Sequence, residues 1–246
     1  MNKRVGLIGM AAIIGIVLVG CGAKEQQASA GPTASTVAAS STVSYDCMSG
    51  VIIDYIDFLK FNDIMFYSEP MDGDKVDVDA LTGAPVGEVG FTMQTQACPG
   101  HQPANGDAAF LPIGTIIYEM KGYKPYFRLI AGGRIYQSND NPNAKNVQDV
   151  LDIAGKVGSI TEESTEDGSF IREVDPAKAE AFVNQVLMLD YVDPATLALG
   201  GNEDVKFFRI HLTDGTSYRF VFARKSLAFN FGAVGNEEIK SLLADE

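Results

Sequence analysis

The segment VKFFRIHLTDGTSYRFVFAR, at residues 205–224, has the pattern of two β-strands joined by a tight turn. Apolar residues alternate along both strands, and Asp214-Gly215 between them is a pair favoured in two-residue type I′ hairpin turns. One side of the hairpin carries Phe208, Ile210, Leu212, Tyr218, Phe220 and Phe222. We therefore expect a β-hairpin that buries this side and leaves the other side half exposed.

The other side of the predicted hairpin combines aromatic and basic residues. It carries Phe207, Arg209, His211, Arg219 and Val221. Arginine and aromatic residues are enriched in protein interfaces, so this side has the composition of a partner-binding surface. The solvated face of an ordinary antiparallel sheet has the same alternation, so both interpretations stay open.

Helices are predicted on both sides of this hairpin in the sequence. Asp175 followed by Pro176 is typical of a helix start, with an N-cap residue and proline at the first helical position. Apolar residues then recur at three- and four-residue spacing through Phe182, Val183, Val186, Leu187 and Leu189. A short strand at 227–231 and a terminal helix at 237–244 complete an α+β half at residues 161–246.

The preceding half, residues 45–160, is predicted to be mainly β. Strand-favouring runs occupy 49–67, 88–95, 115–120, 126–130 and 134–136. Gly132-Gly133 suits a tight hairpin turn. The segments 69–87 and 96–114 are polar or rich in proline and are expected to be loops. The predicted fold class is therefore α+β, with a mainly β N-terminal half followed by a helix, an antiparallel sheet and a terminal helix.

The N-terminus has the order of features found in secretory signal peptides. Lys3 and Arg4 precede an uncharged run, residues 5–19, which is shorter than the ~20 apolar residues that usually span a membrane. Leu18-Val19-Gly20-Cys21 then resembles the bacterial lipobox, in which the cysteine receives a lipid before cleavage. We predict a signal peptide at 1–20 and lipidation of Cys21; an uncleaved signal anchor is the alternative.

A low-complexity segment at 21–44 follows the predicted cleavage site. It consists mostly of Ala, Ser, Thr, Gly and Gln, which cannot bury enough apolar surface to offset the entropy of ordering. It is predicted to be a flexible tether. Two acyl chains on Cys21 would suffice for stable anchoring, which places the protein on the extracytoplasmic face of the cell membrane.

The chain is strongly acidic, with a formal net charge of −13. Its surface is expected to repel nucleic acid and anionic lipid, so neither is a predicted partner. Acidity of this kind also keeps an exported protein soluble, which is its simpler explanation.

Lipidation of Cys21 would leave Cys47 and Cys98 as the remaining thiols in an oxidising compartment. They form either a disulfide or two free thiols, because sequence spacing alone does not determine pairing.

The segment Cys98-Pro99-Gly100-His101, with Asp107 further along, is the strongest local cluster of chemically active side chains. A thiolate, an imidazole and a carboxylate could hold a metal or form a nucleophile with its base. A closed metal site usually takes four protein ligands, and the chain has two histidines. We therefore predict no metal, no cofactor and no catalytic residues, with Cys98, His101 and Asp107 as weak metal candidates.

A second acidic group, Asp72, Asp74, Asp77 and Asp79, lacks the spacing of a calcium-binding EF-hand loop. It is expected to be a solvated turn.

Two further segments are similar to a known group of proteins. NGDAAFLPIGT at residues 105–115 and LTDGTSYRF at residues 212–220 resemble segments of uncharacterised envelope lipoproteins of Bacillus-like Firmicutes. The resemblance covers most of residues 49–246. It implies an envelope location and a two-part architecture, and it implies no catalytic or binding residues.

These observations predict a membrane-anchored lipoprotein without enzymatic activity that binds an envelope protein, a cell-wall component or a small ligand. The expected set of nucleophile, base and orienting group is missing from the sequence. The alternative is a metal- or solute-binding lipoprotein that delivers cargo to a transporter, with the loop at 96–114 beside its site.

Overall fold

The N-terminal half is built around an antiparallel sheet that starts with a tight hairpin. This computed structural model describes residues 55–68, 76–201 and 204–244. Strands β1 (Phe58–Phe61) and β2 (Ile64–Ser68) are joined by Asn62 and Asp63, which have φ values of 50° and 63°. Asn and Asp tolerate this left-handed conformation better than most residues, which explains the two-residue turn.

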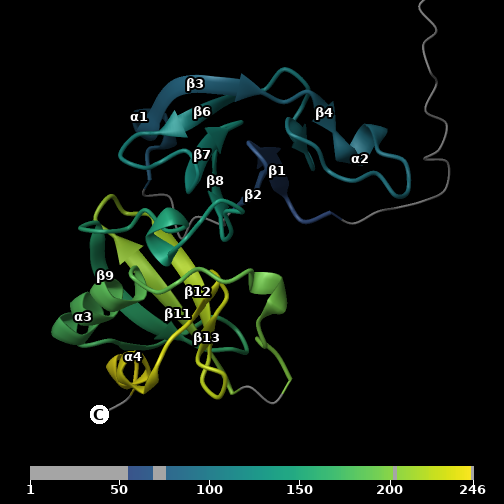
Figure 1. Cartoon of the computed structure of the whole chain (residues 1–246). Coiled ribbons are helices and arrows are strands. Elements are labelled where there is room, and N and C mark those ends of the chain that lie inside the picture. The colour runs from purple at the N-terminus through teal and green to yellow at the C-terminus, as the bar shows by residue number, and fades with distance from the viewer. Residues whose placement is uncertain (1–54, 69–75, 202–203, 245–246) are drawn as a thin grey trace, which may run out of the picture. The chain divides into compact units, whose positions relative to one another are not determined.

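Eight strands make up this sheet in the described part of the chain, in the order β3-β6-β7-β8-β2-β1-β5-β4 (Figure 1). All neighbours are antiparallel except β4 and β5. The remaining strands are β3 (Thr82–Glu88), β4 (Phe91–Thr92), β5 (Asp107–Ala108), β6 (Ile116–Met120), β7 (Arg128–Ala131) and β8 (Arg134–Ser138). Gly132 and Gly133, with φ values of 57° and 72°, form the predicted turn between β7 and β8.

The predicted loop at 69–87 is wrong over its second part, because this part contains α1 (Val78–Leu81) and most of β3. Strand β3 lies at the edge of the sheet, where Pro85 does not interrupt hydrogen bonding to a second neighbour. The predicted strand at 88–95 is also shorter than expected. It contains the last residue of β3 and the two-residue β4 before the chain enters α2 (Met93–Gln96).

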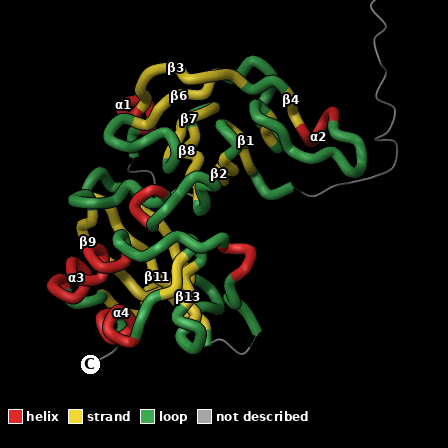
Figure 2. Tube along the Cα trace, in the orientation of Figure 1, coloured by secondary structure: helices red, strands yellow, loops and turns green. Residues whose placement is uncertain are grey.

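The C-terminal half contains a second sheet with helices on one face. Its described strands follow the order β10-β9-β11-β12-β13-β14. Their bounds are β9 (Val157–Glu163), β10 (Phe170–Glu173), β11 (Val205–Leu212), β12 (Ser217–Ala223), β13 (Ala228–Phe229) and β14 (Ala233–Val234). Helices α3 (Pro176–Val186) and α4 (Glu237–Leu242) pack against each other (Figure 2). The fold class is α+β with a mainly β content, as predicted.

The β11–β12 hairpin has the predicted strands and a different turn. Only Gly215 of the predicted Asp-Gly pair has a positive φ, at 85°, whereas a type I′ turn needs positive φ at both central residues. The Gly215 N–H donates to the Leu212 carbonyl, and the Leu212 N–H donates to the Thr216 carbonyl. The turn is therefore the longer type, a type I turn closed by a glycine in the left-handed conformation.

The apolar face of the second sheet forms the larger core. Phe208, Ile210, Tyr218, Phe220 and Phe222 are all buried, as the alternation predicted. Residues that precede β9 also enter this core, among them Phe127, Val147, Val150, Leu151 and Ile153. The predicted boundary between residues 160 and 161 falls inside β9, which pairs with β10 and β11. The described residues from Tyr55 onward belong to one compact unit.

Candidate functional site

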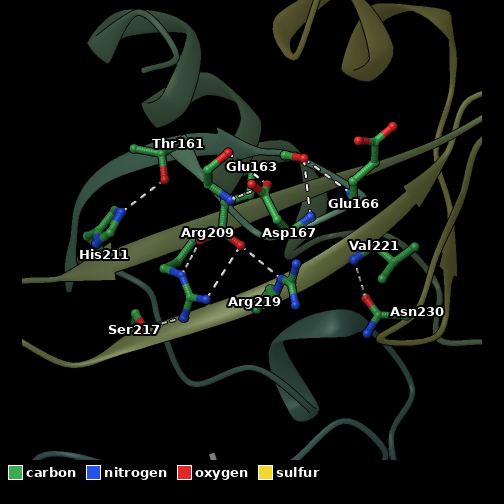
Figure 3. Close-up of polar contacts among 12 residues, drawn as sticks. Thr161, Glu163, Glu166, Asp167, Arg209, His211, Ser217, Arg219, Val221 and Asn230 are labelled. Atoms are coloured by element: carbon green, nitrogen blue, oxygen red, sulfur yellow. Dashed lines mark hydrogen bonds and ion pairs between the residues drawn. The ribbon is translucent and has the colours of Figure 1, made fainter. Parts of the chain in front are cut away.

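One face of the C-terminal sheet, the one opposite the helices, carries mostly polar side chains. Strands β9, β11 and β12 alternate, so one residue in two points away from the apolar core. We call this set the polar face; it consists of Thr161, Glu163, Phe207, Arg209, His211, Ser217, Arg219 and Val221 (Figure 3). It contains the residues that the sequence identified as a possible partner-binding surface.

Glu163 holds the two arginines of the polar face. Arg209 and Arg219 are direct cross-strand partners, an arrangement that would be destabilising for two like charges alone. The Glu163 carboxylate lies on the neighbouring strand β9 and forms ion pairs with the Nε atoms of both arginines, at 2.9 Å for Arg219. Arg209 also donates to the Ser217 hydroxyl at 3.0 Å. One buried carboxylate therefore forms hydrogen bonds with Arg209 and an ion pair with Arg219, which leaves the trio with one net positive charge (Figure 3).

Arg219 is the most outward member of this trio. Its side chain is 37% exposed, whereas those of Arg209 and Glu163 are 14% and 8% exposed. Its guanidinium carbon lies 4.5 Å from the centre of the Phe207 ring, a distance at which a cation is attracted to an aromatic face. Arg219 therefore presents to solvent a guanidinium that contacts both Glu163 and Phe207.

His211 lies further along the same face. Its Nε2 is 3.0 Å from the Thr161 hydroxyl, a hydrogen bond across strands β9 and β11. The structure therefore gives His211 a neutral hydroxyl partner on the sheet face. This pairing differs from a catalytic dyad, in which the imidazole is oriented by a carboxylate and faces a nucleophile.

Two other features border the polar face. At one end, the Asn230 side chain accepts a hydrogen bond of 2.8 Å from the Val221 N–H. At another, the β9–β10 turn carries Glu166 and Asp167 (Figure 3). Hydrogen bonds from the backbone and side chain of Ser169 lower the pKa of Asp167 below its ordinary value, so this carboxylate is negatively charged at neutral pH. The face thus has a positive centre and a negative border.

The structure brings together two of the three residues in the predicted Cys98 cluster. His101 Nε2 lies 2.8 Å from Asp107 Oδ2, and the same carboxylate accepts a hydrogen bond from the Ala104 N–H at 2.9 Å. The His101 ring stacks on Phe91 with 4.7 Å between ring centres. These contacts close the loop that precedes β5.

Cys98 itself is disulfide-bonded. A disulfide sulfur is not a thiolate, so it neither ligates a metal in the usual way nor acts as a nucleophile. A metal site and a cysteine nucleophile at the Cys98 cluster would both need a thiolate at Cys98, which the disulfide removes. The partner of Cys98 lies outside the described residues, so its pairing with Cys47 stays a prediction.

The remaining predicted residues divide between the described and undescribed parts of the chain. Cys21, the signal peptide and the tether lie outside the described residues, as do Asp72 and Asp74. Asp77 caps helix α1 by accepting a hydrogen bond from the Ala80 N–H at 3.1 Å. This cap gives Asp77 a structural role.

Metal-binding clusters and membrane-spanning helices are both missing from residues 55–68, 76–201 and 204–244. No group of three or more His, Cys, Asp or Glu side chains there has an arrangement that could hold a metal ion. Over the same residues, no helix has the length and apolar character needed to cross a membrane.

No protein-family model, curated protein or solved structure matches this chain. The candidate site therefore depends on its own geometry. Sequence reasoning found Arg209 and Arg219 but missed Glu163, which organises them. The available signal was the pair Glu162-Glu163 at the end of the run 157–163, which we did not predict to be a strand and which forms β9; the alternation of a strand places one of these carboxylates on each face of the sheet.

Proposed function

We propose that this chain is a lipid-anchored lipoprotein of the cell envelope that acts as a non-enzymatic binding module. Its polar face docks on another envelope protein. The observation that carries the proposal is the ion-paired trio of Glu163, Arg209 and Arg219, which holds Arg219 against Phe207 at the surface.

Preorganisation is the physical reason why this trio supports binding. An arginine that is free in solvent loses side-chain entropy when a partner immobilises it, which weakens association. Glu163 and Phe207 restrict Arg219 beforehand. A partner carboxylate or backbone carbonyl would then form a charge-assisted hydrogen bond with less entropy lost.

The composition of the face favours a protein partner over a polysaccharide. Arginine and aromatic residues contribute most to the energy of protein interfaces. The negative border at Glu166 and Asp167 adds selectivity, because it repels partners that carry acidic groups beyond the centre of the contact. The expected partner has an acidic or carbonyl-rich centre with a basic or neutral rim.

The anchor in this proposal is supported by the sequence. Lys3 and Arg4, the uncharged run and Cys21 have the order expected of a lipoprotein signal, and the tether at 21–44 would hold the folded part away from the lipid headgroups.

Site-specific photo-cross-linking in living cells tests the proposal. A photoreactive residue at Val221 on the polar face is expected to give one discrete protein adduct, and Arg219→Glu is expected to abolish it. The matched control places the same photoreactive residue at Met188, which is 67% exposed and lies outside the polar face. Cys21→Ser in the same cells is expected to move the protein from the membrane to the soluble fraction.

Three results would contradict the proposal. Adducts of equal yield from positions 221 and 188 would mean that the polar face has no special affinity. A cross-link to cell-wall polymer in place of protein would identify the wrong partner class. Retention of Cys21→Ser in the membrane would contradict the lipid anchor.

A further inference from the structure

The opposite face of the same sheet contains a pocket with an unusual charge. It has a volume of about 210 Å³ and lies where β9, β10, β11 and β12 approach α4. Its lining includes four cationic side chains, from Arg172, Lys206, Arg224 and Lys240. In a chain with a net charge of −13, four cations around one cavity are a marked local exception.

Glu162 is the single carboxylate among the described residues that line this pocket. Its side chain is 4% exposed, and its two oxygens lie 2.8 Å from Arg172 Nε and 2.8 Å from Lys206 Nζ. Arg172 also donates to the Leu243 carbonyl at 2.6 Å, which caps the end of α4. Glu162 therefore holds Arg172 and Lys206 in the pocket lining. Its single negative charge neutralises one of their two positive charges.

The other two cations of the pocket have weaker partners. Arg224 pairs with Asp204 at 3.2 Å, and Lys240 pairs with Glu237 at 3.0 Å. The two carboxylates are 51% and 75% exposed and do not line the pocket. Exposed ion pairs of this kind contribute about 0–1 kcal/mol, so an anion in the pocket can compete for both cations.

The floor of the pocket is apolar, with Phe208 and Phe222 from the sheet and Leu243 from the end of α4. An apolar floor under a ring of cations matches a ligand with a charged oxygen group at one end and a short hydrocarbon at the other. A cavity of about 150 Å³ holds benzene, so the volume of about 210 Å³ suits a ligand of roughly six to nine non-hydrogen atoms.

We infer that this pocket binds a small carboxylate with a short apolar chain, oriented with its carboxylate toward Lys206, Arg224 and Lys240. Inorganic phosphate shares the charged oxygens and lacks the hydrocarbon. This site lies on the other side of the sheet from the polar face, and the inference does not depend on the proposed protein-binding function.

Calorimetric titration of the full chain in detergent tests this inference. Butyrate is the probe, with inorganic phosphate and n-butylammonium as comparisons. We expect butyrate to bind, phosphate to bind at least tenfold more weakly and butylammonium to give no heat of binding. Arg224→Gln and Lys240→Gln should each weaken butyrate binding about tenfold, the effect of losing one charge-assisted hydrogen bond.

Lys145→Gln is the matched control, because it removes one exposed positive charge and Lys145 does not line the pocket. It should leave the affinity for butyrate within about twofold of the starting protein. An equal loss in all three variants would overturn the inference, because the effect would then come from net charge. Equal affinity for butyrate and phosphate would overturn the assignment of the apolar floor.

A shortened variant distinguishes an external ligand from the end of the chain itself. Asp245 and Glu246 follow Ala244, which lines the pocket. A chain that ends at Ala244 should bind butyrate within about threefold of the full chain if the pocket serves an external ligand. Binding by the shortened chain alone would overturn the inference.

Discussion

The Arg128 side chain shows how a single residue connects the two sheets. It is 1% exposed and comes from β7 of the first sheet. Its guanidinium donates to Gln137 Oε1 on the neighbouring strand, and to the Thr216 hydroxyl and the Ser217 carbonyl of the second sheet, at 2.6–2.9 Å. Only arginine offers several donors in one rigid plane, so lysine cannot reproduce this set.

Replacement of this residue gives the first prediction. Arg128→Met should lower the free energy of unfolding by about 3 kcal/mol, because it leaves several buried acceptors without their donor. Urea denaturation measures the change. The control is Arg134→Met, since Arg134 is 60% exposed and pairs with Asp57 at 2.7 Å; its cost should be below about 1 kcal/mol. Similar losses in both variants would contradict a joining role for Arg128.

Tyr123 gives a pH-dependent prediction next to this arginine. Burial raises its pKa, the Arg128 charge lowers it, and the hydrogen bond to Asp214 raises it, which gives a value of about 12. The folded state therefore holds the proton more tightly than the unfolded state, whose tyrosine titrates near 10. Stability from this group is present below pH 10 and is lost as the pH rises toward 12.

Urea denaturation between pH 9 and pH 12 checks this prediction. The starting protein should lose more stability over this range than Tyr123→Phe, which cannot ionise. Absorbance of tyrosinate should show one fewer late-titrating group in the variant. Parallel stability curves for the two proteins would rule out the assigned pKa.

At the scale of elements, α3 depends on its first residues. The Asp175 side chain accepts hydrogen bonds from the N–H groups of Ala177 and Lys178, at 2.9 and 3.1 Å. Asp175→Ala should therefore destabilise the protein by about 1 kcal/mol. Thermal unfolding measures this, with Glu180→Ala as a control that removes an exposed carboxylate from the same helix. If the two substitutions cost the same, the cap contributes nothing beyond charge.

The elements that the sequence predicted best have strong local signals. The start of α3 follows from Asp175-Pro176, and the β11–β12 hairpin follows from alternation over fifteen or so residues. Strand β3 was missed because Gly83, Pro85 and Gly87 are poor strand formers, and its pairing with β6 comes from distant sequence. Tertiary pairing overrides local preference at such an edge.

In the candidate sites, too, some features follow from a local sequence pattern and others depend on pairing between distant segments. Alternation placed Arg209 and Arg219 on the solvent side, which a single hairpin is enough to predict. The ion pairs with Glu163 depend on β9 lying beside β11, a pairing across more than forty residues of sequence. The pocket under α4 likewise collects residues from four strands and a helix. No local pattern carries that information.

At the scale of the whole molecule, each face of the C-terminal sheet carries its own cluster of basic side chains around one glutamate. Glu162 and Glu163 are adjacent in sequence, yet each braces cations on a different face. Each carboxylate is buried and holds two basic side chains, which leaves a positive region on either side of a strongly acidic chain. The sheet thus carries two separate surfaces suited to negatively charged groups.

The disulfide at Cys98 affects the stability of the whole molecule. Whether its partner is Cys47 or Cys21 decides whether Cys21 is free to carry the lipid anchor. We predict that Cys47 is the partner, which would close a loop of about 50 residues and stabilise the fold by about 4 kcal/mol in the chain-entropy model. Cys47→Ser, Cys98→Ser and the double variant should therefore lose the same amount, because each breaks one bond. Cys21→Ser should leave the free energy of unfolding unchanged. If Cys21→Ser instead loses as much as Cys98→Ser, the bond joins Cys21 to Cys98, and the cysteine assigned to the lipid anchor has no thiol to carry it.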